Sequence, residues 1–223
     1  MTMTASIANQ QNNGFLIGAK VIKNNNKELL KGIKITFEWA KTFIKELDFI
    51  PQIDCTITLI KGAEDALTIT DFGQAFCKTA GLIKNAPTNI TNIARSILDF
   101  NWSFFKVCKA LKVNKILPFG KKFITNLSLI GGASFALSSL DKLVTETKAL
   151  FNIDLKTSDE LVLCRFYRIA KNIGTLAIGT IISSGVIFGT TVSATTMLFI
   201  GTVVLISGLS SSILNEIYNL QLK

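Results

Sequence analysis

The side chains that carry out most enzymatic chemistry are absent from this chain or widely separated along it. No histidine occurs in the 223 residues, which excludes Ser-His-Asp triads, Cys-His dyads and two-histidine zinc motifs. The glycines form neither a GxxxxGK phosphate loop nor a GxGxxG turn after a strand. The carboxylates lie at no spacing that indicates a paired acid and base. We therefore expect a protein that is not an enzyme and uses no cofactor.

The cysteines are scattered and form no CxxC pair, so they predict neither a metal site nor a thioredoxin-type redox motif. They are Cys55, Cys77, Cys108 and Cys164. We expect these four thiols to be buried or membrane-facing in a reducing cytosol. With no phosphate loop, metal cluster or catalytic arrangement in the sequence, we also expect no small-molecule substrate.

Lysines and apolar rings alternate in one segment that could bind an anionic surface. No acidic residue occurs between Asp99 and Asp141. The candidate membrane-interface residues are Trp102, Phe104, Phe105, Lys106, Lys109, Lys112, Lys115, Lys121 and Lys122. Such a helix could sink its rings into a bilayer and place its ammonium groups on lipid phosphates. The alternative is an ordinary bundle helix with a solvated lysine face, and the sequence leaves both open.

The longest charge-free stretch covers residues 172–215, which is 44 residues. As a helix it would reach roughly 66 Å, about twice the hydrocarbon core of a bilayer. Two apolar lobes are separated by a weakly polar turn at residues 190–196. This pattern predicts a helical hairpin that crosses a membrane and returns. A soluble helical protein that buries an uncharged hairpin at its centre is the alternative.

The flanks of this stretch predict its orientation and packing. Three basic residues, Arg165, Arg168 and Lys171, precede the first lobe, whereas the turn carries no charge. The positive-inside rule then places both termini in the cytosol and the turn on the opposite side. A small-residue ridge for close helix packing is predicted at Gly185, Gly189 and Ser193.

The remaining sequence predicts an all-α protein, in which an amphipathic helical bundle precedes a C-terminal two-helix transmembrane hairpin. Helices are expected at residues 29–47, 58–84, 88–111 and 121–151, and from a capping box at residues 157–160. Alternation suggestive of a strand is brief, at residues 53–59. Residues 127–140 are uncharged but too short to span, and predict a buried core helix or a shallow re-entrant piece. The expected organisation is a disordered polar leader at 1–16, a cytosol-facing helical region at 17–171, the hairpin at 172–215 and a tail at 216–223.

The overall charge indicates which partners the protein prefers. The net charge is +9, and the mean hydropathy is +0.42. A basic and apolar chain suits an anionic lipid surface. It suits nucleic acid less well, because no helix-turn-helix, RNP or zinc signature accompanies the charge. We expect a membrane partner, protein partners bound through helices, and no nucleic acid.

The combination of a polar leader at residues 1–14 with a bilobed hydrophobic domain at 173–214 resembles the chlamydial inclusion membrane (Inc) proteins. The resemblance is one of architecture and covers about a quarter of the chain. It implies secretion by type III machinery through an uncleaved leader and insertion into the vacuole membrane around an intracellular bacterium. It also implies that both termini face the host cytosol and that the helices bind host proteins or lipids.

Two other classes fit parts of the same pattern. A pore-forming colicin-like domain is all-α and conceals an uncharged hairpin in a soluble form. A membrane-shaping protein similar to the peroxisome-proliferating peroxins would combine basic amphipathic helices with a C-terminal apolar region. A soluble native product would favour the first class, and a product that needs detergent would favour the others.

Overall fold

The computed structural model describes residues 26–43, 50–86, 88–113, 116, 118–153 and 158–221. The described part of the chain is helical, with short connections and no strand, so the predicted all-α class is confirmed. The predictions for the polar leader, Lys115 and Lys223 fall outside the described residues.

The helix bounds agree with the sequence periodicity for some elements and extend beyond it for others. The helices are α2 (Asn26–Phe43), α3 (Ile50–Asn85), α4 (Ile90–Val113), α5 (Lys121–Phe151), α6 (Asp159–Phe188) and α7 (Ala194–Gln221). The alternation at residues 53–59, which is suggestive of a strand, lies inside helix α3. So short a pattern does not distinguish a strand from a helical turn.

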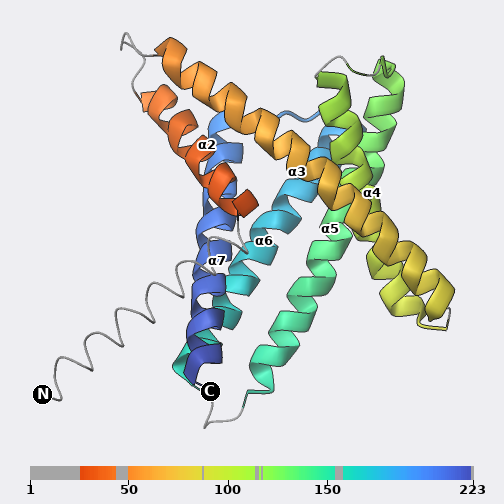
Figure 1. Ribbon diagram of the computed structural model, residues 1–223, viewed down its shortest axis with the longest axis vertical. Coiled ribbons are helices and arrows are strands. Elements are labelled where there is room, and N and C mark those ends of the chain that lie inside the picture. The colour runs from red at the N-terminus through yellow and green to blue at the C-terminus, as the bar shows by residue number, and fades with distance from the viewer. Residues whose placement is uncertain are drawn as a thin grey trace, which may run out of the picture.

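The helices form a closed ring within the described residues. Each helix packs against the next in the chain, and α2 returns to pack against α7 (Figure 1). In that view α3 crosses in front of α6, although those two helices are not close neighbours. The front helices α2, α3 and α4 are rich in charge, whereas α5, α6 and α7 contain the charge-free segments. Of the three charged helices, only α2 packs directly on the hairpin, through α7.

Glycines bring α5 and α6 into direct backbone contact. A Cβ on Gly179 would lie 2.6 Å from the backbone nitrogen of Ala136 and 2.9 Å from the carbonyl oxygen of Gly132. A Cβ on Gly132 would lie 2.8 Å from atoms of Ile182 and Ser183. These positions accept no side chain without moving a helix, because Cβ atoms do not approach backbone so closely.

The ridge predicted at Gly185, Gly189 and Ser193 does not lie between two helices. Gly189 ends α6 in the left-handed region at φ 65°, which glycine adopts without steric cost. The hydroxyl of Ser193 accepts a hydrogen bond from the Thr196 backbone at 3.0 Å, as an N-cap residue does. The spacing of these residues therefore serves the turn between α6 and α7.

The start of α6 does not match the capping box predicted at residues 157–160. Ser158 is the N-cap of α6, and its side chain makes no capping hydrogen bond. Glu160 therefore falls at the second helical position, one residue too early to complete the box with the N-cap.

In the part of the chain that the structure describes, three helices, and not two, are long and apolar enough to cross a membrane, by length and composition alone. They are Lys121–Phe151, Asp159–Phe188 and residues 194–219 of α7. The additional one is α5, where the expectation of a non-spanning piece rested on residues 127–140. The charge-free run begins at Phe123, so it is 18 residues long and reaches the usual span minimum.

Candidate functional site

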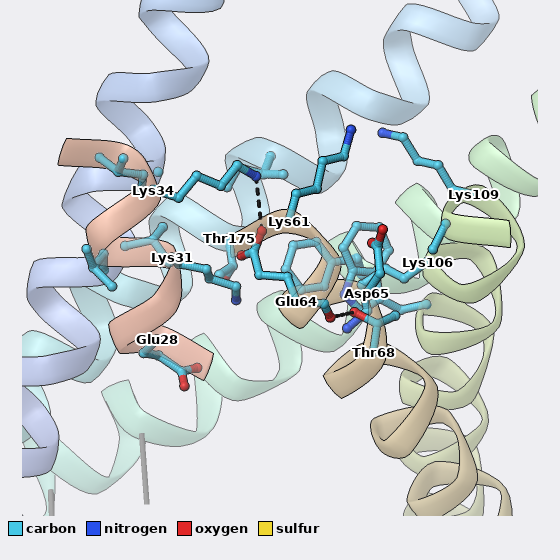
Figure 2. A pocket seen from close by; sticks show the side chains of 18 of the residues that line it. Glu28, Lys31, Lys34, Lys61, Glu64, Asp65, Thr68, Lys106, Lys109 and Thr175 are labelled. Atoms are coloured by element: carbon cyan, nitrogen blue, oxygen red, sulfur yellow. Dashed lines mark hydrogen bonds and ion pairs between the residues drawn. The ribbon is translucent and has the colours of Figure 1, made fainter. Parts of the chain in front are cut away.

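A cavity of about 660 Å³ lies at the centre of the helix ring (Figure 2). All six described helices contribute to its lining, which joins a charged side to an apolar side. The charged residues that line it are Glu28, Lys31, Lys34, Lys61, Glu64, Asp65, Lys106, Lys109 and Lys171. This volume is within the range of about 300–1,000 Å³ that is typical of ligand sites.

The charged side of the cavity comes mainly from α2, α3 and α4. The Lys34 ammonium group forms an ion pair with Glu64 at 3.1 Å and joins α2 to α3. Lys106 lies 3.8 Å from a carboxylate oxygen of Asp71 and 5.8 Å from the centre of the Trp102 ring. Lys109 lies 5.9 Å from the centre of the Phe105 ring. Lysines of α2 and α4 thus meet carboxylates of α3 on this side of the cavity.

The apolar side is formed by one aromatic stack and the hairpin. Trp102 of α4 stacks on Phe135 of α5, with 4.1 Å between ring centroids and 13° between planes. Val204 and Leu205 of α7 and Ile178 of α6 complete the lining. The middle of the uncharged hairpin therefore faces a cavity with lysines on its opposite side.

The aromatic residues of the predicted interface segment pack within the protein. Phe105 is only 4% exposed and lies against Gly131, at a point where α5 could carry no Cβ. Trp102 is half-buried in its stack with Phe135, and Phe104 is half-buried beside Phe72 and Phe100. The aromatic rings therefore pack against neighbouring helices, as expected for the alternative of an ordinary bundle helix.

The lysines of that segment do not form one solvated face. Lys106 and Lys109 line the cavity, and Lys112 is half-buried in the last turn of α4. Lys121 and Lys122 are exposed in the first turn of α5. The structure thus divides the predicted set between the cavity and the end of the bundle near the hairpin turn.

The basic flank of the hairpin forms a polar layer across α5, α6 and α7. Arg165 and Arg168 both approach Glu146 of α5, at 2.5 Å and 3.5 Å. Arg168 also donates to the amide oxygen of Asn215 on α7 at 3.0 Å. The Lys171 side chain lies over Gly208, and a second cavity of about 480 Å³ adjoins this layer. This layer marks the base of the hairpin.

Exposed apolar stripes run along the three long apolar helices. On α5 and α6 many of these side chains recur every seven residues, which places them on one side of the helix. The exposed members include Phe123, Ile130, Leu137, Val144 and Phe151 of α5, Phe166, Ile173 and Ile187 of α6, and Phe199, Val203, Ile206 and Ile213 of α7. An apolar surface of this extent indicates a membrane or protein contact.

The thiols differ from one another in environment. Burial raises the pKa of the Cys108 thiol and of the Cys164 thiol, so both stay protonated at neutral pH. Cys164 also donates to the Ser211 carbonyl oxygen at 3.3 Å. Cys77 is exposed, contrary to the expectation that all four would be buried or membrane-facing. Within the described ranges no three acidic or cysteine residues gather as metal ligands.

Sequence reasoning missed the cavity because its walls come from segments far apart in the chain. The contribution of α2 depends on its contact with α7, where the Trp39 indole donates to the Thr202 hydroxyl across 163 residues of sequence. The local pattern of Lys31 and Lys34 is that of any solvated helix face. No protein-family model, curated protein or solved structure matches this chain significantly.

Proposed function

We propose that this chain is a non-enzymatic membrane protein whose α6–α7 hairpin crosses a bilayer. The observation that supports this most directly is the distance between the polar layer and the turn. From Asn172, just after the last basic residue of this layer, to Phe188, α6 runs 17 charge-free residues or roughly 26 Å, which reaches the lower end of the usual transmembrane length. The exposed apolar stripes of α6 and α7 suit contact with lipid over that length.

The packed ring and an inserted hairpin are alternative states in this proposal. The helix α2 packs halfway along α7, where a Cβ on Gly32 would lie 3.2 Å from Leu205. Insertion in this arrangement would carry Lys31 and Lys34 into the hydrocarbon, at about 2.5–3.5 kcal/mol for each lysine. The helix α2 must therefore leave α7 before the hairpin spans. The contact between α2 and α7 favours a form in which α2 covers the hairpin before the protein meets the membrane, as in the colicin-like alternative.

The helix α5 is long enough to cross but remains outside the bilayer in this proposal. Insertion therefore also requires α6 to leave its backbone contact with α5 at Gly132 and Gly179. The buried face of α5 carries serines that bind α4, including Ser138, which donates to Asp99 at 2.8 Å. The guanidinium of Arg95 also pairs with Asp141 at 2.7 Å. Entry of α5 would break these contacts and move Lys121 and Lys122 to the side of the hairpin turn.

Cysteine labelling tests the number of spans. A two-span chain should protect only Thr191→Cys from a membrane-impermeant thiol reagent, while Lys122→Cys and Lys223→Cys react together on the other side. The native exposed thiol is removed by Cys77→Ser in each variant. Reaction of positions 122 and 191 on one side, with 223 on the other, would show three spans. Extraction of the whole chain by carbonate would refute membrane spanning.

The cellular setting in this proposal follows the architectural resemblance. The protein would be a secreted bacterial effector in a host vacuole membrane, with both termini in the host cytosol and helices facing host proteins or lipids. Export of a reporter fused to residues 1–16 by a type III machine tests the secretion step. Localisation during infection separates this assignment from a peroxin-like membrane-shaping protein.

A protein partner is favoured by the outer face of α3. Its exposed apolar residues follow a strict three-and-four spacing, which is the seam of a coiled coil and narrower than a lipid-binding face. The seam consists of Leu59, Gly62, Ala66, Ile69, Gly73, Phe76, Ala80 and Ile83. An antiparallel second copy would set Ile69 opposite Gly73 and Phe76 opposite Ala66, so large residues meet small ones. We propose self-association through this seam.

A charge in the seam should separate the copies. Phe76 is 56% exposed, although its ring centroid lies 6.3 Å from that of Phe100 on α4. Phe76→Asp should therefore leave the monomer folded, at the cost of that one ring contact, while placing a carboxylate inside the helix pair. We expect light scattering to show at least a tenfold weaker dimer. The control is Lys78→Asp, an exposed position outside the seam on the same helix. A dimer that Phe76→Asp leaves unchanged would exclude this surface.

A further inference from the structure

We infer that the central cavity binds one amphipathic anion, namely an acyl chain with a phosphate or carboxylate head. The inference rests on the closed ring of helices and does not depend on insertion of the hairpin. The cavity combines two features that one such ligand would satisfy together: an excess of lysine on one side and an apolar surface on the other.

The charge balance of the lining identifies the head group. Six lysines and three acidic residues line the cavity. One acidic residue, Glu64, is already paired with Lys34 at 3.1 Å. In Figure 2 the ammonium ends of Lys61 and Lys109 point toward one another from α3 and α4. Two like charges directed at one space repel each other, and an anion between them would turn this repulsion into two charge-assisted hydrogen bonds.

The opposite side of the cavity identifies the rest of the ligand. The Trp102–Phe135 stack and the Val204 and Leu205 side chains offer apolar contact and few groups for hydrogen bonding. Lys34 and Lys106 already have acidic partners in Glu64 and Asp71. A free phosphate would leave the apolar surface wet, and a neutral lipid would place no anionic group beside Lys61 and Lys109. A single acyl chain with an anionic head meets both requirements. Lys61 and Lys109 are exposed side chains of a partly open cavity, so the head group would stay near water while the acyl chain contacts the apolar side.

Fluorescence of Trp102 reports binding directly. The chain contains two tryptophans, and Trp39 is kept because its indole helps to close the ring, so Trp102→Phe is the control in which saturable quenching should be lost. With the full chain held in amphipol, dibromostearate should quench Trp102 in a saturable manner. The dibrominated monoacylglycerol of the same chain should bind about tenfold more weakly, because one charge-assisted contact is worth about that factor. Inorganic phosphate at the same concentration should not displace the brominated fatty acid.

Lysine variants locate the head group. Lys61→Gln with Lys109→Gln should weaken dibromostearate binding at least tenfold and leave the neutral lipid unchanged. The matched control, Lys78→Gln with Lys84→Gln, removes two exposed lysines of α3 that lie outside the cavity. Equal affinity for neutral and anionic lipids, or equal weakening by both double variants, would overturn the inference. Full displacement by phosphate would instead assign the site to a free anion and reject the acyl chain.

Discussion

A disulfide between α2 and α7 should keep the hairpin out of a bilayer until it is reduced. In the packed ring a Cβ on Gly32 lies 3.2 Å from Leu205 Cδ2, so Gly32→Cys with Leu205→Cys places two thiols across this contact. The oxidised pair ties Lys31 and Lys34 to the middle of α7, and insertion would then bury both charges. We expect carbonate-resistant association with liposomes to fall at least tenfold in the oxidised chain and to recover after reduction. Cys77→Ser is present throughout to prevent links between copies.

Two controls separate the lock from the substitutions themselves. Gly32→Cys alone cannot form the bridge and should insert equally with or without reductant. Leu205→Cys alone changes the α7 side of the contact and leaves no thiol on α2 to pair with it. This second single variant should also insert equally with or without reductant. If the chain locked at positions 32 and 205 inserts as well as the reduced chain, the ring and the inserted hairpin are compatible and the two-state proposal is wrong.

The helical class was predictable because it depends on local patterns. Apolar spacing of three and four residues, a charge-free run of 44 residues and few prolines all favour helices, and the bounds of α5 agree with the expectation at both ends. The ring was not predictable, because its closing contact joins Trp39 to Thr202. Lys109 is exposed, as expected for a solvated face, and also lines the cavity; no local pattern shows that a solvated lysine borders a cavity.

The packing glycines show a second limit of sequence reasoning. The GxxxG motif at Gly185 and Gly189 drew attention because of its spacing, yet Gly189 ends a helix. The glycines that the structure uses, Gly132 and Gly179, lie on different helices and share no motif. Gly179 is an isolated glycine in a helical pattern, whose cost in helix propensity signals a packing reason. Gly132 belongs to the adjacent pair Gly131-Gly132, which predicts close helix packing, and neither pattern names the partner helix.

Of the three glycine-to-alanine substitutions proposed, Gly179→Ala should lower the stability of the fold most. The added Cβ would meet the Ala136 backbone nitrogen at 2.6 Å, and backbone in two packed helices cannot yield as a flexible side chain does. Overpacking of this kind costs about 3 kcal/mol, the upper end of its usual range. For a chain of this size the melting temperature should fall by roughly 6–12 °C. Thermal unfolding of the full chain in amphipol, followed by circular dichroism, measures the shift.

Two glycine controls decide whether the α5–α6 contact is responsible for the loss of stability expected in Gly179→Ala. Gly81→Ala lies within α3, where a Cβ would meet nothing within 4 Å, so it should gain about 0.5–1 kcal/mol from helix propensity. Gly185→Ala tests the motif itself, since its Cβ would lie 3.1 Å from the Thr190 carbonyl oxygen in a turn that can adjust. We expect it to cost less than Gly179→Ala. The opposite order would mean that the motif ridge holds the helices together and that α5 does not pack on α6 through Gly179.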